Sequence, residues 1–480
     1  QVDSFEMLTA ASSIIRPGVS ESGMMKAFIT ANRRCAGQAL RPASSDPLPN
    51  SNSLSAEEKY HAHRTRPGGK WWMEEILKDT YGIMIYQEDV IKVAHTIGGM
   101  SLGEADSLRK CMSKKRDWQD IKTHRDRFVS GAMKNGVQKQ AAEEIWRQIE
   151  SFAGYAFCKA HSASFAIGSY QAAYLKAHYP AEFMAAVLSN RGGFYDACAY
   201  TEEARRLGIQ ILPPDIHLSD ERFTATSVTL DPIGNRSIRQ TKSSLGSKNH
   251  CQLPPRQAVR VGLSQVKGLS QNSIDEILKN RPYVSLADFL ARTKISVSET
   301  ESLIRCEAFN TLEANSIELL WQLKLHRRRP RGKSGLFSQS DPPIPKLPEY
   351  TLQEKLLAEL ECLDLTVSDH LLHLYSFHTN KLAQTAICGN QLEKFSGRLV
   401  TLIGWAITFK RTRTVKNELM KFMTLEDTTA TFEVTLFPRV YKQFGHLLHD
   451  RGPYIIRGRI EQEGHCHTVT ALWVGRAFDF

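Results

Sequence analysis

The sequence lacks several features, and each absence excludes a class of protein. Its 480 residues contain no run of eighteen apolar residues, so no segment is predicted to span a membrane. We expect no secretory signal. The nine cysteines are odd in number and never form a CxxC pair, which argues against zinc sites and disulfide frameworks. We therefore expect a protein of the reducing cytoplasm.

Dense groups of metal-binding side chains are also scarce. The nearest candidates are His61-Ala62-His63 and His465-Cys466-His467, and neither has a convincing set of further ligands. The chain has no initiator methionine and opens on Gln1 inside patterned sequence, so we expect a fragment of a longer protein. Its 41% hydrophobic and 24% charged fractions are ordinary for globular domains, and its length allows two to four of them.

Positive charge is abundant and unevenly placed. Lysine and arginine outnumber the acids by 62 to 51, which gives a net charge of +11. The excess gathers at 109–116, 327–333 and 410–416. Phosphate contacts supply most of the nonspecific affinity of proteins for nucleic acids, so these groups favour a polyanionic partner. Solvated faces are the alternative, because runs of charge often have no partner.

The spacing of apolar residues divides the chain into segments. Helical patterns run from Gln1 to Arg34, with a turn at Arg16-Pro17-Gly18, and again from Trp71 to Leu212. A loop rich in Ser, Pro, Asn and Gly separates them over 35–70. Polar, irregular sequence follows over 216–255, so the helical part of the chain is expected to end near Leu212.

A short extended piece that runs into Gly268 comes next, followed by a helix over 273–280 and a second helical pair over 285–309. Helices joined by a tight turn can present backbone amides to a DNA phosphate in the helix-hairpin-helix arrangement, and an ordinary helical hairpin has the same pattern. A basic and then proline-rich linker is predicted over 326–349, followed by a helix over 351–363.

The C-terminal part changes to the alternating period of strands. The predicted order is strands at 399–409, 418–425 and 431–437, a helix at 438–448, and strands at 454–461 and 468–474. This is the order of an OB-fold barrel. Such barrels often bind single strands through a cationic groove and stacking rings. The candidate rings, unless they fill the barrel, are Trp405, Phe409, Phe422 and Phe437.

Residues 151–183 carry two unlike stripes if a helix begins near His161. The polar stripe suits either a polar ligand or solvent and consists of His161, Ser164, Gly168 and Gln171. The apolar stripe is expected to be core and consists of Ala163, Ile167, Tyr170 and Tyr174. Lys159 adds a cation near the helix N-terminus, where a phosphate would be favoured.

Four collinear blocks resemble the bacterial replicative DNA polymerase III alpha subunit family (family C), particularly its error-prone branch. They are SIIRPGVSESGMM at 13–25, YGIMIYQEDVIKVAHTIGGMSLGEADSLRKCMSKKR at 81–116, FAGYAFCKAHSASFAIGSYQAAYLKAHYPAEFMAAVLSN at 152–190 and LGIQILPPDI at 207–216. Further pieces at 261–269, 347–359 and 422–441 follow in the same order. The resemblance thus covers nearly the whole chain.

The resemblance implies a multidomain fold that is mainly α in its fingers and helix-hairpin-helix regions and ends in a β OB-fold barrel. The boundaries that it suggests are 1–215 for the fingers region, 216–315 for a connecting segment and tandem helix-hairpin-helix, 316–397 for a linker and helix, and 398–480 for the OB-fold.

Together, the resemblance and the residue patterns imply where nucleotide and DNA bind. The incoming nucleotide is expected near Arg109, Lys110, Lys114, Lys115, Lys159, His161 and Ser162, with Arg16 as a weaker candidate. DNA is expected near Lys267 and Gly268 of the first hairpin and near Trp405, Lys410, Arg411, Arg413 and Phe422 of the barrel.

The sequence departs from the family pattern at several positions. Lys110 stands where a second arginine is usual, and Ser270 and Glu307 stand where hairpin glycines are usual. Residues 333–337, KSGLF, resemble a motif that binds a sliding clamp, here through Leu336 and Phe337. A linker that anchors itself on the core is the alternative interpretation.

The carboxylates that a polymerase needs for Mg²⁺ are not evident. In the family they belong to a palm region ahead of this part, and Asp3, Glu104 and Asp106 do not match them. We therefore expect the part of a template-directed DNA polymerase, in replication or error-prone repair, that binds dNTP, primer-template and single-stranded DNA and is inactive alone. A non-catalytic DNA-binding accessory protein is the alternative, and an RNA-binding barrel protein is a weaker one.

Overall fold

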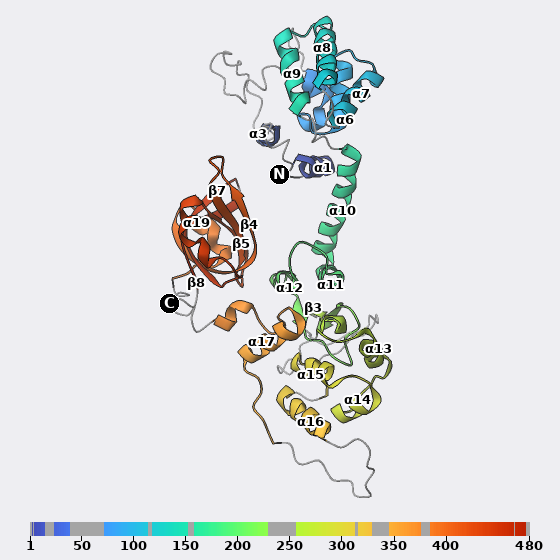
Figure 1. Ribbon diagram of the computed structural model, residues 1–480, viewed down its shortest axis with the longest axis vertical. Coiled ribbons are helices and arrows are strands. Elements are labelled where there is room, and N and C mark those ends of the chain that lie inside the picture. The colour runs from blue at the N-terminus through green and yellow to red at the C-terminus, as the bar shows by residue number, and fades with distance from the viewer. Residues whose placement is uncertain are drawn as a thin grey trace, which may run out of the picture. The chain divides into compact units, whose positions relative to one another are not determined.

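A computed structural model describes residues 2, 4–14, 24–38, 72–113, 118–151, 158–228, 256–312, 315–328, 345–375, 385–464 and 466–476. They belong to two compact units, Gln1–Tyr174 and Leu175–Phe480 (Figure 1). The first unit has one large apolar core and the second has two. In the ranges above, no helix has both the length and the apolar character needed to cross a membrane.

The first unit is helical, and its apolar core is built from buried residues of α1, α3, α5, α6, α7, α8 and α9. The rings of Phe128 and Trp146, both buried, are 5.8 Å apart in this core. The helices of the unit are α1 (Phe5–Ile14), α3 (Met24–Gln38), α5 (Trp72–Ile76), α6 (Gln87–Thr96), α7 (Leu102–Ser113), α8 (Trp118–Lys134) and α9 (Lys139–Ser151), with a 3-10 turn η1 (Lys78–Thr80).

Two glycines allow α8 to approach the turn that follows α6. A β-carbon on Gly131 would lie 1.8 Å from the carbonyl oxygen of Gly98. A β-carbon on Gly98 would in turn lie 2.5 Å from the ring of Phe128. The turn at Gly98 and Gly99 is therefore a site of close packing.

Helix α10 (Lys159–His178) is continuous, as its periodicity predicts, but its apolar stripe is not core. Ile167 is 49% exposed, Tyr170 61% and Tyr174 48%. The prediction that this stripe is buried is therefore wrong. The physical reason is that the described apolar cores are built from α1–α9 and from α11 onward and include no residue of α10.

The second unit begins with helices around a small mixed sheet. Its order is β1-β3-β2, with β1 parallel and β2 antiparallel to β3. The rings of Phe289 and Phe309 meet edge to face, with centroids 5.0 Å apart, in the core below this sheet. The elements are α11 (Pro180–Asn190), α12 (Ala197–Arg206), β1 (Gln210–Leu212), β2 (Thr224–Val228), β3 (Arg256–Arg260) and the 3-10 turn η2 (Leu263–Gln265).

The predicted helix over 273–280 and helical pair over 285–309 follow this sheet as α13 (Gln271–Lys279), α14 (Leu286–Arg292) and α15 (Val297–Arg305). The elements after them are α16 (Ser316–Arg328), α17 (Leu352–Leu363), which the sequence places at 351–363, and the 3-10 turn η3 (Leu371–Tyr375). The side chains of Ser270, Ser285 and Ser296 cap α13, α14 and α15 by accepting a backbone N–H. Each of these short helices therefore begins directly after its capping serine.

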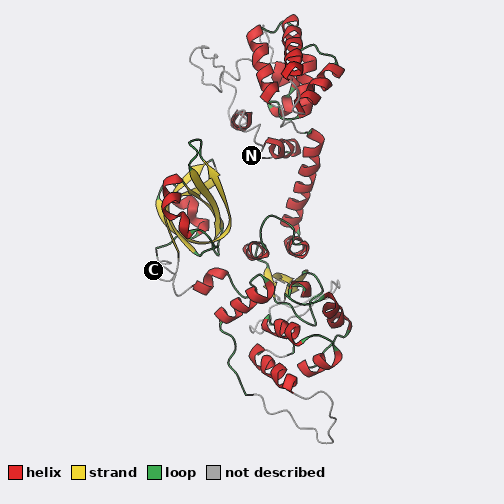
Figure 2. Cartoon of the chain, viewed as in Figure 1, coloured by secondary structure: helices red, strands yellow, loops and turns green. Residues whose placement is uncertain are grey.

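The C-terminal strands close into a barrel of order β4-β5-β6-β8-β7, in which β6 and β8 are parallel (Figure 2). The prediction of three strands, a helix and two strands is confirmed. The elements are the 3-10 turn η4 (Gly389–Phe395), β4 (Leu399–Arg413), β5 (Leu419–Glu426), β6 (Thr431–Leu436), α19 (Pro438–Phe444), the 3-10 turn η5 (Gly445–Leu447), β7 (Tyr454–Glu463) and β8 (Cys466–Arg476). Alternate residues such as Leu425, Val434 and Val469 fill its interior.

Candidate functional site

Two predicted cations of α7 share one carboxylate. The Nε of Arg109 donates to Oδ1 of Asp106 at 2.9 Å, and Nζ of Lys110 lies 2.8 Å from Oδ2 of Asp106. Hydrogen bonds from Lys110 and then Arg109 lower the pKa of Asp106. Arg109 also donates to the amide oxygen of Gln87 on α6 at 3.2 Å. Because two positively charged side chains share one carboxylate, this part of α7 keeps a net positive charge. The same contacts fix the side chains of Arg109 and Lys110.

The N-terminus of α10 is already engaged by acids. The backbone N–H of Lys159 donates to Glu88 at 3.0 Å, and its Nζ donates to Asp79 at 3.4 Å. The same Nζ lies 5.5 Å from the centre of the Tyr86 ring. The carboxylate of Glu88 therefore lies where the sequence suggested a phosphate.

His161 and Ser162 have different surroundings. His161 is exposed, and its ring meets Phe165 edge to face at 4.7 Å. Ser162 is fully buried, and its hydroxyl lies 2.5 Å from that of Ser13 on α1. The structure thus presents His161 to solvent and uses Ser162 to hold α1 against α10. The other predicted nucleotide contacts, Arg16, Lys114 and Lys115, lie outside the described residues, as do Leu336 and Phe337.

The first hairpin contains Lys267 and Gly268, and an internal carboxylate caps it. Gly268 has a φ of +79°, as a tight turn requires. At the start of α13, Glu299 accepts the backbone N–H of Ser270 at 2.9 Å and the hydroxyl of Ser273 at 2.8 Å. The backbone amide of Ser270, which a phosphate could approach at this hairpin, is therefore used by Glu299.

Hydrogen bonding dominates the ionisation of Glu299. Burial opposes its charge, but hydrogen bonds from Ser270, Ser296 and Ser273 lower its pKa to about 2. Ser270 has a φ of −76°, so it needs no glycine and serves as the helix cap. Glu307 does occupy a glycine-like conformation, with a φ of 63°, and lies 2.6 Å from Nζ of Lys355. The charge added by Glu307 is therefore balanced.

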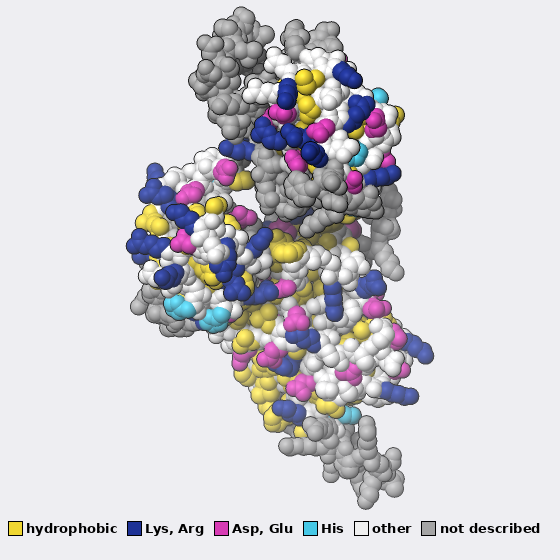
Figure 3. Space-filling model, turned by 45° about the horizontal axis from the view of Figure 1, so that its top comes forward, with side chains coloured by type: hydrophobic (Ala, Val, Ile, Leu, Met, Phe, Trp, Pro, Cys, Tyr) yellow, Lys and Arg dark blue, Asp and Glu magenta, His cyan; other side chains and the backbone are white. Residues whose placement is uncertain are grey.

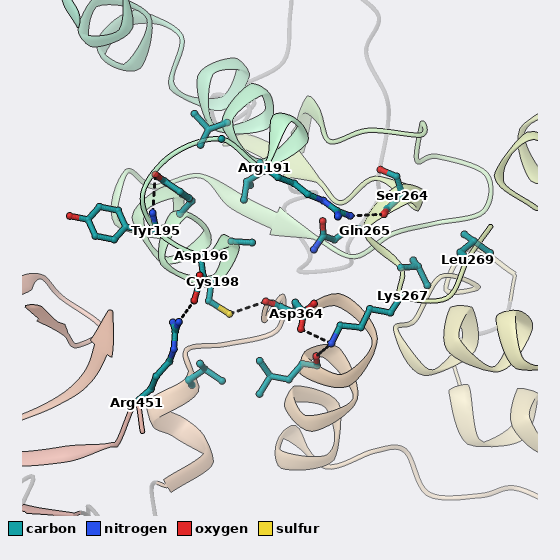
Figure 4. Close-up of a pocket in the computed structure, with 18 of the residues that line it drawn as sticks. Arg191, Tyr195, Asp196, Cys198, Ser264, Gln265, Lys267, Leu269, Asp364 and Arg451 are labelled. Atoms are coloured by element: carbon teal, nitrogen blue, oxygen red, sulfur yellow. Dashed lines mark hydrogen bonds and ion pairs between the residues drawn. The ribbon is translucent and has the colours of Figure 1, made fainter. Parts of the chain in front are cut away.

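A cavity of about 910 Å³ brings three predicted residues together. Lys267 and Gly268 of the hairpin line it with Trp405 of the barrel, and the ends of α11 and α17 complete the wall (Figure 4). Its cations include two that the sequence analysis missed, Arg191 and Arg451. Neither belongs to a run of basic residues, so a search for clustered charge could not find them.

Each cation of this cavity has an internal partner. Nζ of Lys267 lies 2.5 Å from the carboxylate of Asp364, and Arg451 pairs with Asp196. Arg191 donates to the backbone carbonyl of Ser264 at 3.2 Å. The thiol of Cys198 donates to the carbonyl of Asp364, and burial raises its pKa to about 12, so it is a poor nucleophile.

The remaining predicted DNA contacts lie on the β4–β5 hairpin of the barrel, away from Trp405 along the strands. The register pairs Lys410 with Phe422 and Arg411 with Lys421. Nζ of Lys421 lies 4.0 Å from the centre of the Phe409 ring. Lys421 is buried and donates to the carbonyl of Leu448 at 2.8 Å, so the exposed groups here are Lys410, Arg411 and the rings of Phe409 and Phe422. Figure 3 shows lysine and arginine side chains spread over the barrel.

A buried ion pair joins α12 to the barrel. Arg206 donates to Glu426 of β5 at 3.1 Å and to Glu203 at 3.2 Å, and Glu203 accepts from Lys176 at 2.6 Å. Burial raises the pKa of Glu426 to about 7, although Arg206 opposes the shift. The contact between α12 and the barrel therefore includes a carboxyl group whose ionisation is opposed by burial.

Across the described part of the chain, no group of three or more His, Cys, Asp and Glu side chains could hold a metal ion. Two acids of the first unit show why. Glu104 accepts the N–H of Ser101 at 2.7 Å and the Nε of Arg127 at 3.1 Å, and Asp106 is taken by Arg109 and Lys110. These carboxylates serve internal contacts, so they do not fit Mg²⁺.

Comparison with known proteins gives matches to two families. Residues 1–136 match the family described as bacterial DNA polymerase III alpha subunit finger domain, and residues 208–319 match the helix-hairpin-helix motif. The second match covers the hairpin and capped helices described above.

Curated relatives align over most of the chain. An error-prone DNA polymerase of Symbiobacterium thermophilum is 29% identical, over 98% of this chain and 43% of its own length. DNA polymerase III subunit alpha of Xylella fastidiosa is 32% identical over 83% of this chain and 34% of its own length. The same subunit of Thermus aquaticus is 32% identical over 85% of this chain and 32% of its own. The chain thus spans about a third to two fifths of the length of these relatives.

Proposed function

Because the chain belongs to the family of bacterial DNA polymerase III alpha subunits and error-prone DNA polymerases, we propose that it supplies the fingers, helix-hairpin-helix and barrel regions of a template-directed DNA polymerase. The observation that carries this proposal is the order of three regions along the chain. The finger-domain match at 1–136, the helix-hairpin-helix match at 208–319 and the closed barrel from Leu399 follow one another in a single chain. An accessory DNA-binding protein would have no need of the finger domain.

The incoming nucleotide is proposed to lie against α7 and the start of α10. Arg109 and Lys110 carry more charge than Asp106 removes, and Lys159 and His161 lie at the start of α10. A triphosphate would compete with Asp106 for these cations, since phosphate accepts charge-assisted hydrogen bonds from arginine and lysine. Arg16, Lys114 and Lys115 are proposed to add to this charge, and Ser162 to hold the helix that presents it.

Primer-template and single-stranded DNA are proposed to lie along the second unit. The hairpin at Lys267 and Gly268 contacts backbone phosphate, and the barrel contacts the strand through Lys410, Arg411, Arg413 and Phe422. The exposed Lys410 and Arg411, with Phe422 paired to Lys410 on the neighbouring strand, support this assignment. A sliding clamp is proposed to bind through Leu336 and Phe337.

Polymerase chemistry uses divalent metal, and Mg²⁺ is the ion expected for the whole enzyme. The described residues do not fit it, because Glu104 and Asp106 are engaged in internal contacts and no ligand cluster exists among them. We therefore assign no catalytic step to these residues and restrict their role to binding and positioning.

The proposal is tested by titrating the chain against a fluorescent primer-template with a 5′ overhang at several salt concentrations and following anisotropy. The expected result is an affinity that falls steeply with salt, because several phosphates are contacted. The double variant Lys410→Ala with Arg411→Ala should lower the salt slope by about two.

The matched control is Arg147→Ala on α9, a highly exposed arginine outside the proposed contacts. It should leave the slope unchanged. Absence of binding at low salt, or a slope that Arg147→Ala lowers as much as the barrel variant does, would overturn the proposal.

A further inference from the structure

The loop that follows α11, residues 191–196, displays aromatic rings in a fixed shape. Phe194 is 81% exposed, and its ring meets that of Tyr195 at 5.2 Å. Tyr195 in turn meets Tyr200 of α12 at 6.1 Å. The backbone N–H of Phe194 donates to the hydroxyl of Tyr200 at 3.1 Å. Tyr200 therefore holds the loop while leaving Phe194 in solvent.

One glycine of this loop is required for its conformation. Gly193 has a φ of +112°, and a β-carbon there would lie 1.9 Å from the hydroxyl of Tyr200. The loop is thus built to keep its rings in place, and an exposed ring fixed in this way is available for stacking.

The same loop forms part of the wall of the 910 Å³ cavity. Arg191 begins the loop, and Lys267 and Arg451 reach the cavity from the hairpin and the barrel (Figure 4). Three cations from three elements, against the two acids Asp196 and Asp364, leave a net positive charge of one among the charged residues lining the cavity. A volume of this size accommodates a nucleotide.

The internal partners of these cations are weak competitors. The side chain of Asp364 is 68% exposed and that of Asp196 is 56% exposed. Exposed ion pairs contribute little, because water screens them. The partner of Arg191 is a neutral carbonyl, that of Ser264. A phosphate carries more charge and more acceptor oxygens than any of these groups, so it can displace them.

We propose that this cavity and its loop bind one unpaired nucleotide of single-stranded DNA, which stacks its base on Phe194 and places its phosphate against Arg191, with Lys267 and Arg451 adding charge. The inference rests on the proposed function, since it names a further contact of the same DNA. An aromatic platform beside a cationic cavity suits an unpaired strand, whose bases are free to stack, and not a duplex, whose bases are stacked already.

The test compares a labelled oligothymidylate with a blunt duplex in anisotropy titrations of the whole chain. Phe194→Ala should weaken binding of the oligothymidylate by about tenfold without changing its salt slope, since stacking carries no charge. Arg191→Gln, which can still donate to Ser264, should lower the slope by about one. Binding of the duplex should be unchanged in both variants.

The controls remove an exposed ring and an exposed cation elsewhere, through Trp321→Ala on α16 and Arg147→Ala on α9. Both should bind the oligothymidylate as wild type does. Competing dTTP should not displace the oligothymidylate, because stacking and several phosphates are needed together.

Three results would overturn the inference and leave the proposed function standing. They are wild-type affinity for the oligothymidylate in both loop variants, an equal loss of duplex binding, and displacement by dTTP as effective as by unlabelled oligothymidylate. If the wild-type chain binds neither DNA, the proposed function and this inference fall together.

Discussion

At the scale of residues, Glu299 shows how an internal group can occupy a position expected for a ligand. Its carboxylate accepts hydrogen bonds from Ser270 and Ser273 at the start of α13 and caps its own helix through Ser296. These contacts stabilise the hairpin pair, but they also place a negative charge beside the turn at Gly268. Stability and phosphate binding are thus opposed at one side chain.

Glu299→Gln should therefore destabilise the chain and strengthen its binding of duplex DNA. Loss of charge-assisted hydrogen bonds should lower the free energy of unfolding by about 1–2 kcal/mol. Removing one negative charge near the phosphate should raise the affinity about fivefold at low salt. Urea unfolding and anisotropy measure the two effects.

Glu299 also makes the stability of the chain depend on pH, because its pKa falls from an ordinary 4.5 to about 2 in the folded chain. Its stabilising contribution is present above pH 4.5 and is lost as the pH falls toward 2. Glu301→Gln, the same change at an exposed position of α15, is the control. Equal DNA affinities for wild type and Glu299→Gln would contradict the account.

A second prediction concerns Gly131, where α8 touches the turn after α6. A β-carbon there would meet the carbonyl oxygen of Gly98 at 1.8 Å, so backbone must move. Gly131→Ala should cost about 3 kcal/mol or more. Gly103→Ala on α7 is the matched control, because nothing lies within 4 Å of its β-carbon. That control should be neutral or stabilising by up to about 1 kcal/mol in thermal or urea unfolding. Similar stabilities for the two variants would contradict the packing described.

At the scale of elements, α12 carries the charges that attach the barrel. Arg206 bonds Glu426 of β5, and Arg205 donates to the carbonyl of Thr366 ahead of η3 at 2.7 Å. Burial raises the pKa of Glu426, and burial lowers the pKa of His370 to about 4. The attachment of the barrel therefore contains two groups whose ionisation is opposed by burial.

The account predicts that Glu426 makes the chain less stable as the pH rises through about 7. Its pKa is raised from 4.5 to about 7 in the folded state, so its stabilising contribution is full below pH 4.5 and is lost on ionisation. His370, lowered from 6.5 to about 4, contributes the opposite slope between those values. The effect of Glu426 is thus clearest above pH 6.5.

Glu426→Gln should flatten the decline in melting temperature on raising the pH from 6.5 to 8, relative to wild type, by an amount equivalent to about 0.8 kcal/mol. Differential scanning calorimetry measures it. Glu433→Gln on β6, an exposed acid of the same barrel, should keep the wild-type decline. A Glu426→Gln profile parallel to that of wild type would contradict the assignment.

Elements with strong local signals could be predicted from the sequence. The barrel strands alternate buried and exposed residues, and serines mark the starts of α13, α14 and α15. The apolar stripe of α10 was wrongly predicted to be buried. Periodicity shows that a helix has two unlike faces, but it does not show which face packs against a core. Ile167 and Tyr170 have the spacing of core residues and are exposed.

The candidate site was predictable only in part. Lys267 and Trp405 were found through the family pattern and the barrel pattern, and the fold brings them to one cavity. Arg191, Tyr195 and Arg451 were missed, because each is isolated in the sequence and acquires its neighbours only through folding. Glu299 was missed for the same reason, since its partner Ser270 lies on another helix.

At the scale of the whole molecule, a net charge of +11 is distributed over both units. Cations of α7 lie in the first unit, and those of the cavity and of β4–β5 lie in the second. Each unit has its own apolar core, so each can present its cations on a stable surface. A long phosphate backbone could engage both, and the account therefore predicts a distributed contact with DNA.

Hydrogen exchange of the chain with and without primer-template DNA tests the central claim most directly. The account predicts slower exchange at α7, at the hairpin 264–270 and at the β4–β5 hairpin, because DNA covers these segments. Exchange in α9 and α14, which carry none of the proposed contacts, should be unchanged. Protection confined to α9 and α14, or no protection in the presence of saturating DNA, would contradict the assignment of this chain to the DNA-binding part of a polymerase.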